Sequence, residues 1–394
     1  MRKLSTIKNF LFPKMKDGTK PKAILMLYGF FGNNLGDDIF MDILLKRYPD
    51  TLFYVLFTAE YERFFEKYNN VRYYSYSRPL VDKINRFGRK HENDMLFEEI
   101  LLKRSDGAVH IGGSVYQQIG NWENDLSVRK RRHIYAKHFF GITNNFGPFF
   151  SEDYKLFWKE QFKKFDSVTF RDMYSYNSFK ELSNVSYAPD LLFSLEKPEV
   201  EQKKNSVAIS VINPREEFRK IDKKLADNYI AALSNLTALL VKDGYSVKLL
   251  GFCNLENDTA TINEIANSLE DNLKKNVEVI PYNNDFSNTV EHIASSEYIV
   301  ATRFHASVLG FAFSKKVLPV SYNVKIKNML SDLGVDTYID FEKAGEYSAE
   351  DLKRLLLSLS PFNGSEQKEK ARRHFGALDK FIKTKKGKIN EQKS

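Results

Sequence analysis

The sequence predicts an α/β protein with two doubly wound domains, each built on a mainly parallel sheet. Short apolar runs alternate with helical patterns along most of the chain, which is typical of strands joined by helical crossovers. Residues 196–206 are charged and lack periodicity, as expected of an interdomain linker. The length of 394 residues also favours more than one domain, since about 150 residues per domain is the usual expectation.

The first half opens with a strand, a glycine loop and a helix, the order in which a doubly wound domain begins. Residues 23–28 are apolar, residues 29–36 hold three glycines, and residues 37–47 have a helical pattern. Further strands are predicted at residues 51–57, 107–111, 167–170 and 185–187. Helical patterns lie between these runs, so we expect helices on both faces of the sheet.

The second half repeats this alternation after the charged stretch. Residues 223–242 form a long amphipathic helical pattern. Strands are predicted at residues 206–212, 245–250, 277–280, 298–300 and 316–322. We therefore predict an N-terminal extension (1–22), a first domain (23–196), a linker (197–205), a second domain (206–360) and a basic C-terminal helix or tail (361–394). Two such domains would form an interdomain cleft, a usual place for a small-molecule site.

The composition is that of an ordinary soluble globular protein, with 42% hydrophobic and 28% charged residues. The net charge of +9 favours acidic partners, and basic residues gather at 367–394 and at Arg129–Arg132. No RNP, zinc-finger or helix-turn-helix signature accompanies them, so no nucleic acid partner is expected. The Arg129–Arg132 cluster could contact an anionic membrane surface or could simply be a solvated face.

Compartment is inferred from cysteine usage and apolar segments. Cys253 is the only cysteine, which excludes an internal disulfide and favours a reducing compartment. The apolar stretch near the N-terminus is too short for a signal-peptide core, and no segment approaches the roughly 20 apolar residues that span a bilayer. We expect a cytoplasmic protein that could touch a membrane peripherally.

Residues 301–307, Ala-Thr-Arg-Phe-His-Ala-Ser, are the most informative stretch for function. Arg303 and His305 fall between the end of a predicted strand and a helix rich in small residues. Free backbone N–H groups at a helix N-terminus favour anions, and α/β folds bind ligands at the carboxyl edge of the sheet. Lys325 begins the helix after the next strand, so two fixed cations and one titratable group are expected to converge. The alternative is a capping pair or surface residues.

Other candidates follow the earlier predicted strands. Asp37 could act as a base or accept sugar hydroxyl hydrogen bonds, or it could only cap its helix. Gly112 and Gly113 would let a ligand approach the backbone, or they form a plain tight turn. Arg171 and Asp172 could bind a ligand or only pair with each other. No motif for a metal site, a P-loop or a serine-triad elbow occurs, so no metal is expected.

Taken in order, these motifs resemble the polysaccharide pyruvyl transferase family from about residue 23 to about residue 330. The Arg-x-His unit at 303–305 with the Tyr-x-x-Lys unit at 322–325 is the strongest part. The remaining motifs are Gly-Asn-Asn-Leu-Gly-Asp at 32–37, Gly-Gly-Ser at 112–114, Asn-Phe-Gly-Pro at 145–148, Thr-Phe-Arg-Asp at 169–172 with Ser175, and Ala-Pro-Asp at 188–190. The chain departs from the family pattern at Ser114, where a third glycine is common, and in its bulkier first loop.

The resemblance implies two Rossmann-like domains in a GT-B-like arrangement, with the first on the acceptor side and the second on the donor side. It implies an enzyme that moves the pyruvyl unit of phosphoenolpyruvate onto a sugar of a cell-surface polysaccharide or its lipid-linked precursor, usually as a ketal. On this basis His305 is predicted to be the general acid, Asp37 a base, and Arg303, Lys325 and Tyr322 the donor-binding residues. Further candidates are Asn34, Gly112, Gly113, Ser114, Arg171 and Asp190. No cofactor is expected beyond the donor substrate.

Two other functions stay open from the sequence. A GT-B glycosyltransferase that uses a nucleotide sugar would also place basic residues of its second domain against a diphosphate. A non-catalytic protein of the same fold could instead bind glycan or lipid through its basic surface. The intact Arg303, His305 and Lys325 favour an enzyme over this last alternative.

Overall fold

The computed structural model describes residues 13–57, 61–91, 93–120, 122–123, 132 and 134–391. The chain divides into two compact units, and each unit is built from more than one segment of the sequence. Unit 1 takes the chain up to Phe31, Phe40–Ala188, and the chain from Arg372 onwards. Unit 2 takes Gly32–Ile39 and Pro189–Ala371, so it begins before the predicted linker at 197–205 and includes part of the first glycine loop.

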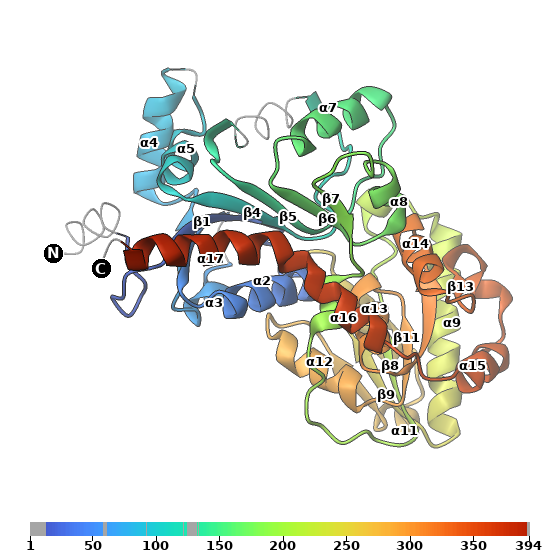
Figure 1. The fold of residues 1–394 in the computed structure, drawn as a ribbon. Coiled ribbons are helices and arrows are strands. Elements are labelled where there is room, and N and C mark those ends of the chain that lie inside the picture. The colour runs from blue at the N-terminus through green and yellow to red at the C-terminus, as the bar shows by residue number, and fades with distance from the viewer. Residues whose placement is uncertain are drawn as a thin grey trace. The chain divides into compact units, whose positions relative to one another are not determined.

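Unit 1 is built on a parallel sheet whose described strands follow the order β3-β2-β1-β4-β5-β6-β7 (Figure 1). β1 lies between β2 and β4, with Leu25 level with Phe53 on one side and with Gly107 on the other. The strands are β1 (Ala23–Tyr28), β2 (Thr51–Phe57), β3 (Val71–Ser75), β4 (Gly107–Ile111), β5 (Phe139–Asn144), β6 (Ser167–Phe170) and β7 (Val185–Tyr187). Continuous apolar runs form the central strands because both faces of a parallel sheet are buried.

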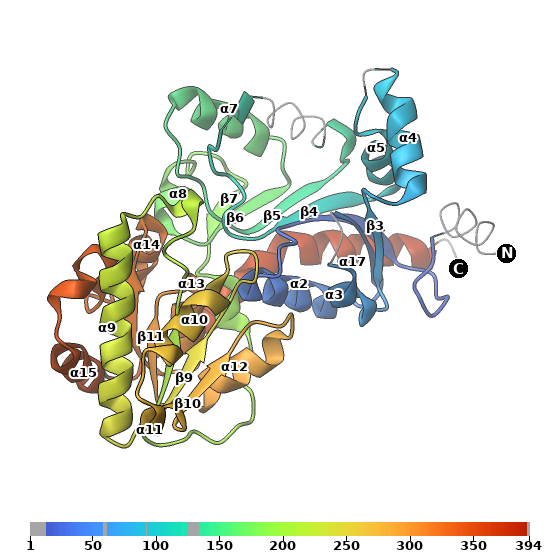
Figure 2. The ribbon, with the colours of Figure 1, turned by 180° about the vertical axis from the view of Figure 1, so that it is seen from behind.

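Helices cover both faces of this sheet (Figures 1 and 2). They are α2 (Leu35–Arg47), α3 (Glu62–Glu66), α4 (Pro79–Arg89), α5 (Leu96–Arg104), α7 (Glu152–Phe162), α8 (Met173–Asn177) and α17 (Gly376–Glu391). The basic C-terminal segment is therefore helical as far as Glu391. In α17, Phe381 packs on Phe140 of β5 with ring centroids 5.3 Å apart, and Asp379 pairs with Arg47 at 2.6 Å.

Unit 2 is built on a second parallel sheet, whose described strands follow the order β10-β9-β8-β11-β12-β13. Its strands are β8 (Ser206–Ser210), β9 (Ser246–Leu250), β10 (Val277–Ile280), β11 (Tyr298–Ala301), β12 (Lys316–Ser321) and β13 (Ile339–Asp340). The long helix α9 (Lys223–Lys242) has the predicted bounds, and Asp222 caps its N-terminus by accepting hydrogen bonds from two backbone N–H groups. Its apolar stripe, including Leu233 and Leu236, packs into the same buried core as Val207 and Val300 of the sheet.

The remaining elements of unit 2 complete its two helical layers. α9 covers one face of the sheet, while α12 and α13 lie on the other (Figure 2). The helices are α10 (Asp258–Asn267), α11 (Asp271–Lys274), α12 (Phe286–Ser295), α13 (Phe304–Ala312), α14 (Val324–Leu333), α15 (Ala349–Ser358) and α16 (Ser365–Ala371), and the 3-10 turns are η1 (Leu191–Ser194), η2 (Glu217–Arg219) and η3 (Phe341–Glu346). η4 (Arg372–Phe375) precedes α17 in unit 1.

The carboxyl edge of the unit 2 sheet collects loops from distant parts of the sequence. Because its strands are parallel, the segments after β8, β9, β11 and β12 all leave the sheet at this edge. The segment Gly32–Ile39 joins them there: Leu35 N–H donates to the carbonyl of Phe252 at 3.0 Å, and Asn34 forms an isolated bridge with Cys253. No helix in the described part of the chain is long and apolar enough to cross a membrane.

Candidate active site

The carboxyl end of β11 leads directly into α13, and Arg303 is the N-cap residue of that helix. Its backbone is extended, with φ −71° and ψ 132°, and its N–H donates to Ser210 Oγ at 3.2 Å. α13 can approach the sheet closely because Gly310 has no side chain; a Cβ there would lie 2.6 Å from Val317 Cγ2. The small-residue helix thus fixes where Arg303 and His305 emerge from the sheet.

Arg303 is 6% exposed and is held by two carboxylates. Its Nε donates to Asp258 Oδ2 at 2.9 Å, Nη2 contacts the other oxygen of Asp258, and Nη1 contacts Glu256 Oε2. Burial alone would lower the pKa of Arg303, but these carboxylates outweigh burial and raise that pKa well above its ordinary value. The guanidinium is therefore charged and already has countercharges.

Glu256 bridges two guanidiniums, because its Oε2 also contacts Nη2 of Arg219. Burial would raise the pKa of Glu256, yet Arg303 and Arg219 together lower it. The side chain of Glu256 is 25% exposed, whereas those of Arg219 and Arg303 are 6% and 7% exposed. Arg219 also lies over the ring of Tyr322, with its guanidinium carbon 5.0 Å from the ring centroid. The carboxylate is thus the most accessible member of this charged group.

Asp258 anchors the same group from the start of α10. Its Oδ2 accepts hydrogen bonds from the backbone N–H groups of Phe252 (2.9 Å) and Cys253 (3.0 Å). Burial raises the pKa of Asp258, while Arg303 opposes that rise. The sequence prediction missed Asp258, Glu256 and Arg219. The two acids follow the carboxyl end of β9, so the strand-end rule that singled out Arg303 could have found them.

His305 lies in the first turn of α13 and faces two parts of unit 2. Its Nε2 is 4.0 Å from Asp190 Oδ2, and the two side chains are 12% and 1% exposed. Asp190 is fixed in turn, since its Oδ1 accepts a hydrogen bond from Leu192 N–H at 2.9 Å and caps η1. The imidazole also lies against Gly36, where a Cβ would be only 1.7 Å from Nδ1. The carboxylate of Asp190 and the backbone of Gly36, which has no side chain, therefore set the position of the imidazole.

The two acids at the start of α2 have different surroundings. Asp38 is fully buried and accepts a short hydrogen bond from the Tyr282 hydroxyl. Burial, followed by the charge of Asp38, raises the pKa of Tyr282 well above its ordinary value. Asp37 is partly exposed in the same helical turn, and Asn34 Oδ1 accepts a hydrogen bond from Gly36 N–H at 3.1 Å. Of the two carboxylates, Asp37 is the one that solvent reaches.

Lys325 belongs to the neighbouring strand–helix unit. It is the second residue of α14, whose N-cap Asn323 accepts a hydrogen bond from Ile326 N–H at 3.1 Å. β12 is hydrogen-bonded to β11, so Lys325 leaves the sheet at the same edge as Arg303. Its side chain is partly buried.

The other predicted residues lie together in unit 1, after β4 and β6. Arg171 is 6% exposed, and its guanidinium lies over Gly113, where a Cβ would be 2.1 Å from Nη2. Its Nε donates to Asn145 Oδ1 at 2.5 Å, while Asn145 also bonds Asp172. Arg171 and Asp172 are thus joined through Asn145.

The adjoining loop and helix account for the remaining residues of this motif. Gly112 has φ +134° and its carbonyl accepts a hydrogen bond from Asn144 Nδ2 at 2.8 Å; Ser114 follows in an exposed position. Asp172 caps α8 by accepting a hydrogen bond from Ser175 N–H.

The basic cluster at 129–132 is described only at its last residue. Arg132 Nε donates to Glu98 Oε1 at 2.7 Å, and the two side chains are 25% and 3% exposed. Arg129–Arg131 lie outside the described residues. Arg132 itself is therefore engaged by a buried carboxylate within unit 1.

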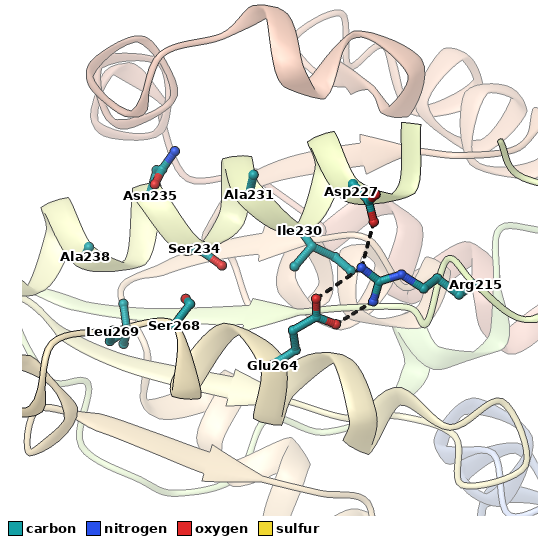
Figure 3. Close-up of a pocket in the computed structure, with 10 residues that line it drawn as sticks. All are labelled: Arg215, Asp227, Ile230, Ala231, Ser234, Asn235, Ala238, Glu264, Ser268 and Leu269. Carbon is teal, nitrogen blue, oxygen red and sulfur yellow. Dashed lines mark hydrogen bonds and ion pairs between the residues drawn. The ribbon is translucent and has the colours of Figure 1, made fainter. Parts of the chain in front are cut away.

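An open groove of about 410 Å³ lies elsewhere on unit 2, between α9 and α10 (Figure 3). At one end Arg215 is held by Glu264 (2.5 Å) and Asp227 (2.7 Å). The rest of the groove is lined by Ser234, Asn235 and Ser268 together with alanine, isoleucine and leucine side chains. Neither His305 nor any other predicted residue lines this groove. Within the described ranges, no group of three or more His, Cys, Asp or Glu side chains could hold a metal ion.

Comparison with solved structures agrees with the fold of the two units. The chain resembles the structure of HepE from Anabaena in complex with UDP and glucose, with a TM-score of 0.50, 11% identity and coverage of 96% of this chain and 99% of that one. It also resembles UDP-GlcNAc 2-epimerase from Neisseria meningitidis bound to UDP-GlcNAc, with a TM-score of 0.51, 12% identity and coverage of 91% and 99%. These likenesses establish the fold, two parallel-sheet α/β domains of the GT-B type. No curated protein sequence matched the chain.

A sequence model of one family covers most of the chain and includes the segments that build the site. The model for polysaccharide pyruvyl transferase matches residues 34–324, from Asn34 in the first glycine loop to the start of α14. Arg303 and His305 lie within that match, as do Asp190, Glu256 and Asp258. The chain is a member of the polysaccharide pyruvyl transferase family.

Proposed function

We propose that this protein transfers the pyruvyl unit of phosphoenolpyruvate to a sugar of a cell-surface polysaccharide or of its lipid-linked precursor, forming a ketal. Family membership supports a transferase that modifies polysaccharide. The observation that carries the finer proposal is that His305 faces Asp190 and follows the same strand end as Arg303, whose guanidinium shares the accessible carboxylate of Glu256 with Arg219. Such a site offers a proton donor and an anion-binding position on one sheet edge.

The proton donor is the first requirement of the reaction. The methylene carbon of phosphoenolpyruvate must gain a proton, which leaves positive charge at the carbon that bears the phosphate ester. Imidazole is the side chain most often used as a general acid near neutral pH, and in His305 the carboxylate of Asp190 lies 4.0 Å from Nε2, where it favours a protonated ring. Asp190 is therefore a positioning residue, and His305 is the proposed general acid.

Two sugar hydroxyls complete the exchange of bonds. One hydroxyl oxygen attacks the positive carbon, and its proton passes to a base, for which Asp37 is the candidate. The C–O bond to phosphate then breaks, and the second hydroxyl closes the ketal. One of the two hydroxyl protons replaces the proton that the general acid gave to the methylene carbon. The other leaves with the released phosphate as hydrogen phosphate. No redox partner or metal is required by this balance.

Donor binding follows from the Glu256 bridge. An oxygen anion between Arg219 and Arg303 is where a carboxylate or phosphate of the donor would be stabilised most, and in this structure the 25% exposed carboxylate of Glu256 occupies that position. We therefore expect the donor to displace Glu256 while Asp258 keeps Arg303 in place. Lys325 and Tyr322 at the same edge are the remaining proposed donor contacts.

The proposal is tested with purified His305→Ala protein in a phosphate-release assay. The acceptor is a glycan extract from cells that lack the gene, and the matched control is His91→Ala, which removes an exposed imidazole in unit 1. We expect turnover to fall by roughly 100- to 10,000-fold in the first variant and to be unchanged in the second. Wild-type turnover in His305→Ala protein would remove the imidazole from this role.

A nucleotide-sugar glycosyltransferase is the alternative, because HepE was solved with UDP and glucose on the same fold. The discriminating experiment compares the rise in melting temperature caused by phosphoenolpyruvate with that caused by a panel of nucleotide sugars. Stabilisation by phosphoenolpyruvate alone supports pyruvyl transfer, and stabilisation by one nucleotide sugar alone supports the alternative. The acceptor, the cellular location and contact with a membrane surface stay predictions.

A further inference from the structure

Three exposed side chains of unit 1, two of them aromatic, lie on segments that leave its sheet at the carboxyl edge. Ile119 follows β4, Phe150 follows β5 and Tyr174 follows β6, and these three parallel strands are neighbours in the sheet. The exposed fractions are 70% for Ile119, 81% for Phe150 and 50% for Tyr174. Parallel sheets bind ligands outside this edge, and exposed apolar groups that gather on a surface mark interaction sites.

Gln118 joins the first two of these segments. Its backbone N–H donates to the carbonyl of Pro148 at 2.9 Å. Its side-chain Oε1 accepts a hydrogen bond from the N–H of Phe150 at 2.5 Å. Ile119 is the next residue in the chain, so it lies beside the turn that carries Phe150.

Tyr174 meets the same turn from the other side of the sequence. A Cβ at Gly147 would lie 3.9 Å from Cε1 of Tyr174 and 3.7 Å from Cδ1 of Phe149. The N–H of Gly147 donates to the carbonyl of Tyr116 at 2.8 Å, which ties the turn to the segment after β4. The three exposed side chains therefore belong to one connected surface within unit 1.

The motifs at 112–114, 145–148 and 169–175 form the support beneath this surface. The N–H of Asn145 donates to the carbonyl of Gly113 at 2.7 Å, and its Oδ1 accepts a hydrogen bond from Arg171 Nε at 2.5 Å. The Oγ of Ser175 accepts a hydrogen bond from the N–H of Phe146 at 2.8 Å. The reaction steps proposed above use none of these groups. Their contacts instead fix the backbone from which the exposed rings project.

The charges beside Phe150 favour one class of ligand. α7 begins with the exposed carboxylates of Glu152 and Asp153. The first basic residue of this helix, Lys155, is partly buried, and its charge acts on Glu181. The two exposed carboxylates would repel an anionic bilayer, whereas an uncharged sugar ring can lay its C–H groups on an aromatic face.

We propose that Ile119, Phe150 and Tyr174 form an aromatic platform on which sugar rings of the polysaccharide acceptor stack. Family membership supports a polysaccharide substrate. Because its ligand is the acceptor of the reaction, the platform rests on the function proposed above. The rings hold the glycan and take no part in the bond changes, so these three residues bind the acceptor and are not catalytic.

Native gel electrophoresis of the purified protein through delipidated polysaccharide, prepared from cells that lack the gene, tests the platform directly. We expect the polysaccharide to retard the wild type. Phe150→Leu and Tyr174→Leu should each weaken this binding about tenfold, because leucine is apolar but has no ring. Tyr174→Phe keeps the ring and should bind as the wild type does. The matched control is Phe87→Leu, at a phenylalanine of α4 that is 60% exposed and should not affect retardation.

Phosphate-release kinetics separate the platform from donor binding. In both leucine variants the KM for the polysaccharide should rise about tenfold. The increase in Tm caused by phosphoenolpyruvate should stay that of the wild type. If phosphoenolpyruvate is not used but the leucine variants lose retardation, the proposed function fails and the glycan platform stands.

Three results would overturn the platform while leaving pyruvyl transfer in place. The first is phosphate release by a wild-type protein that the polysaccharide does not retard. The second is wild-type retardation in both leucine variants. The third is binding of the wild type to phosphatidylglycerol vesicles but not to polysaccharide, which would assign the exposed rings to a membrane.

Discussion

Replacing Gly36 by alanine tests whether the position of His305 matters for turnover. A Cβ at Gly36 would lie 1.7 Å from Nδ1 and 2.2 Å from Cε1 of the imidazole. Since non-bonded heavy atoms settle at about 3.5 Å, the ring has to retreat by about 1.8 Å. The backbone of Gly36 is not in the left-handed region, so alanine is compatible with the helix itself.

The expected effect separates activity from stability. A displacement of about 1 Å in a reacting group can reduce a rate by about 100-fold, which corresponds to about 2.7 kcal/mol of activation free energy. We expect at least this loss in phosphate release from phosphoenolpyruvate. The free energy of unfolding should change by less, because alanine favours a helix over glycine by about 1 kcal/mol and so offsets part of the cost of moving the ring.

The matched control is Gly376→Ala, at a glycine whose added Cβ would meet no atom within 4 Å. Both variants are compared with the wild type in the phosphate-release assay and in thermal unfolding. Full turnover by a folded Gly36→Ala protein would refute the view that this contact positions the imidazole for catalysis. Equal loss in both variants would also refute it, because the loss would then not depend on His305.

Four further predictions use other contacts of unit 2. Asp190→Asn should lower phosphate-release turnover about 10- to 100-fold, less than His305→Ala does, because the imidazole loses the carboxylate that faces it at 4.0 Å. Glu256→Gln should tighten phosphoenolpyruvate binding in calorimetry; weaker binding would contradict the displacement model. Cys253 should resist a disulfide reagent at pH 8 until the protein unfolds, because burial raises the pKa of its thiol to about 12. The difference in free energy of unfolding between wild type and Lys315→Met, measured by denaturant titration, should rise from pH 8 to pH 10, because the pKa of Lys315 is about 8 when folded and the unfolded chain then binds more protons.

Most strands could be predicted because they are continuous apolar runs. Three were missed: β13 is only two residues long, and β3 and β5 were missed for reasons of composition. β3 is buried only at its two ends and contains Arg72, so it carries no apolar run. β5 is buried at all six positions but contains Gly141 and Asn144, residues that are depleted in strands. Gly141 is needed there because a Cβ would lie 2.6 Å from Asn144 Oδ1. Tertiary packing at that position outweighs strand propensity.

The site was predictable in part for a similar reason. Arg303 and Lys325 each follow a predicted strand, and parallel strands end at the same edge of a sheet. Their locations can therefore be predicted from the local sequence alone. Their partners depend on which strands are neighbours, and Asp258 reaches Arg303 because β9 and β11 both flank β8. Strand order cannot be derived from apolar periodicity, so the neutralisation of Arg303 was not foreseen.

The segment Gly32–Ile39 has a consequence for how this protein can be divided. It is separated from Pro189 by the whole of the Phe40–Ala188 segment of unit 1, yet it supplies Gly36 beneath His305 and Asp38 beside Tyr282. A fragment that starts at Pro189 would lack both, and the carbonyl of Phe252 would lose the hydrogen bond from Leu35 N–H. The second unit therefore does not form its site from Pro189–Ala371 alone. Gene fusions and truncations that separate it from the first glycine loop should lose the site. Adding that loop back as a peptide offers a direct test of complementation.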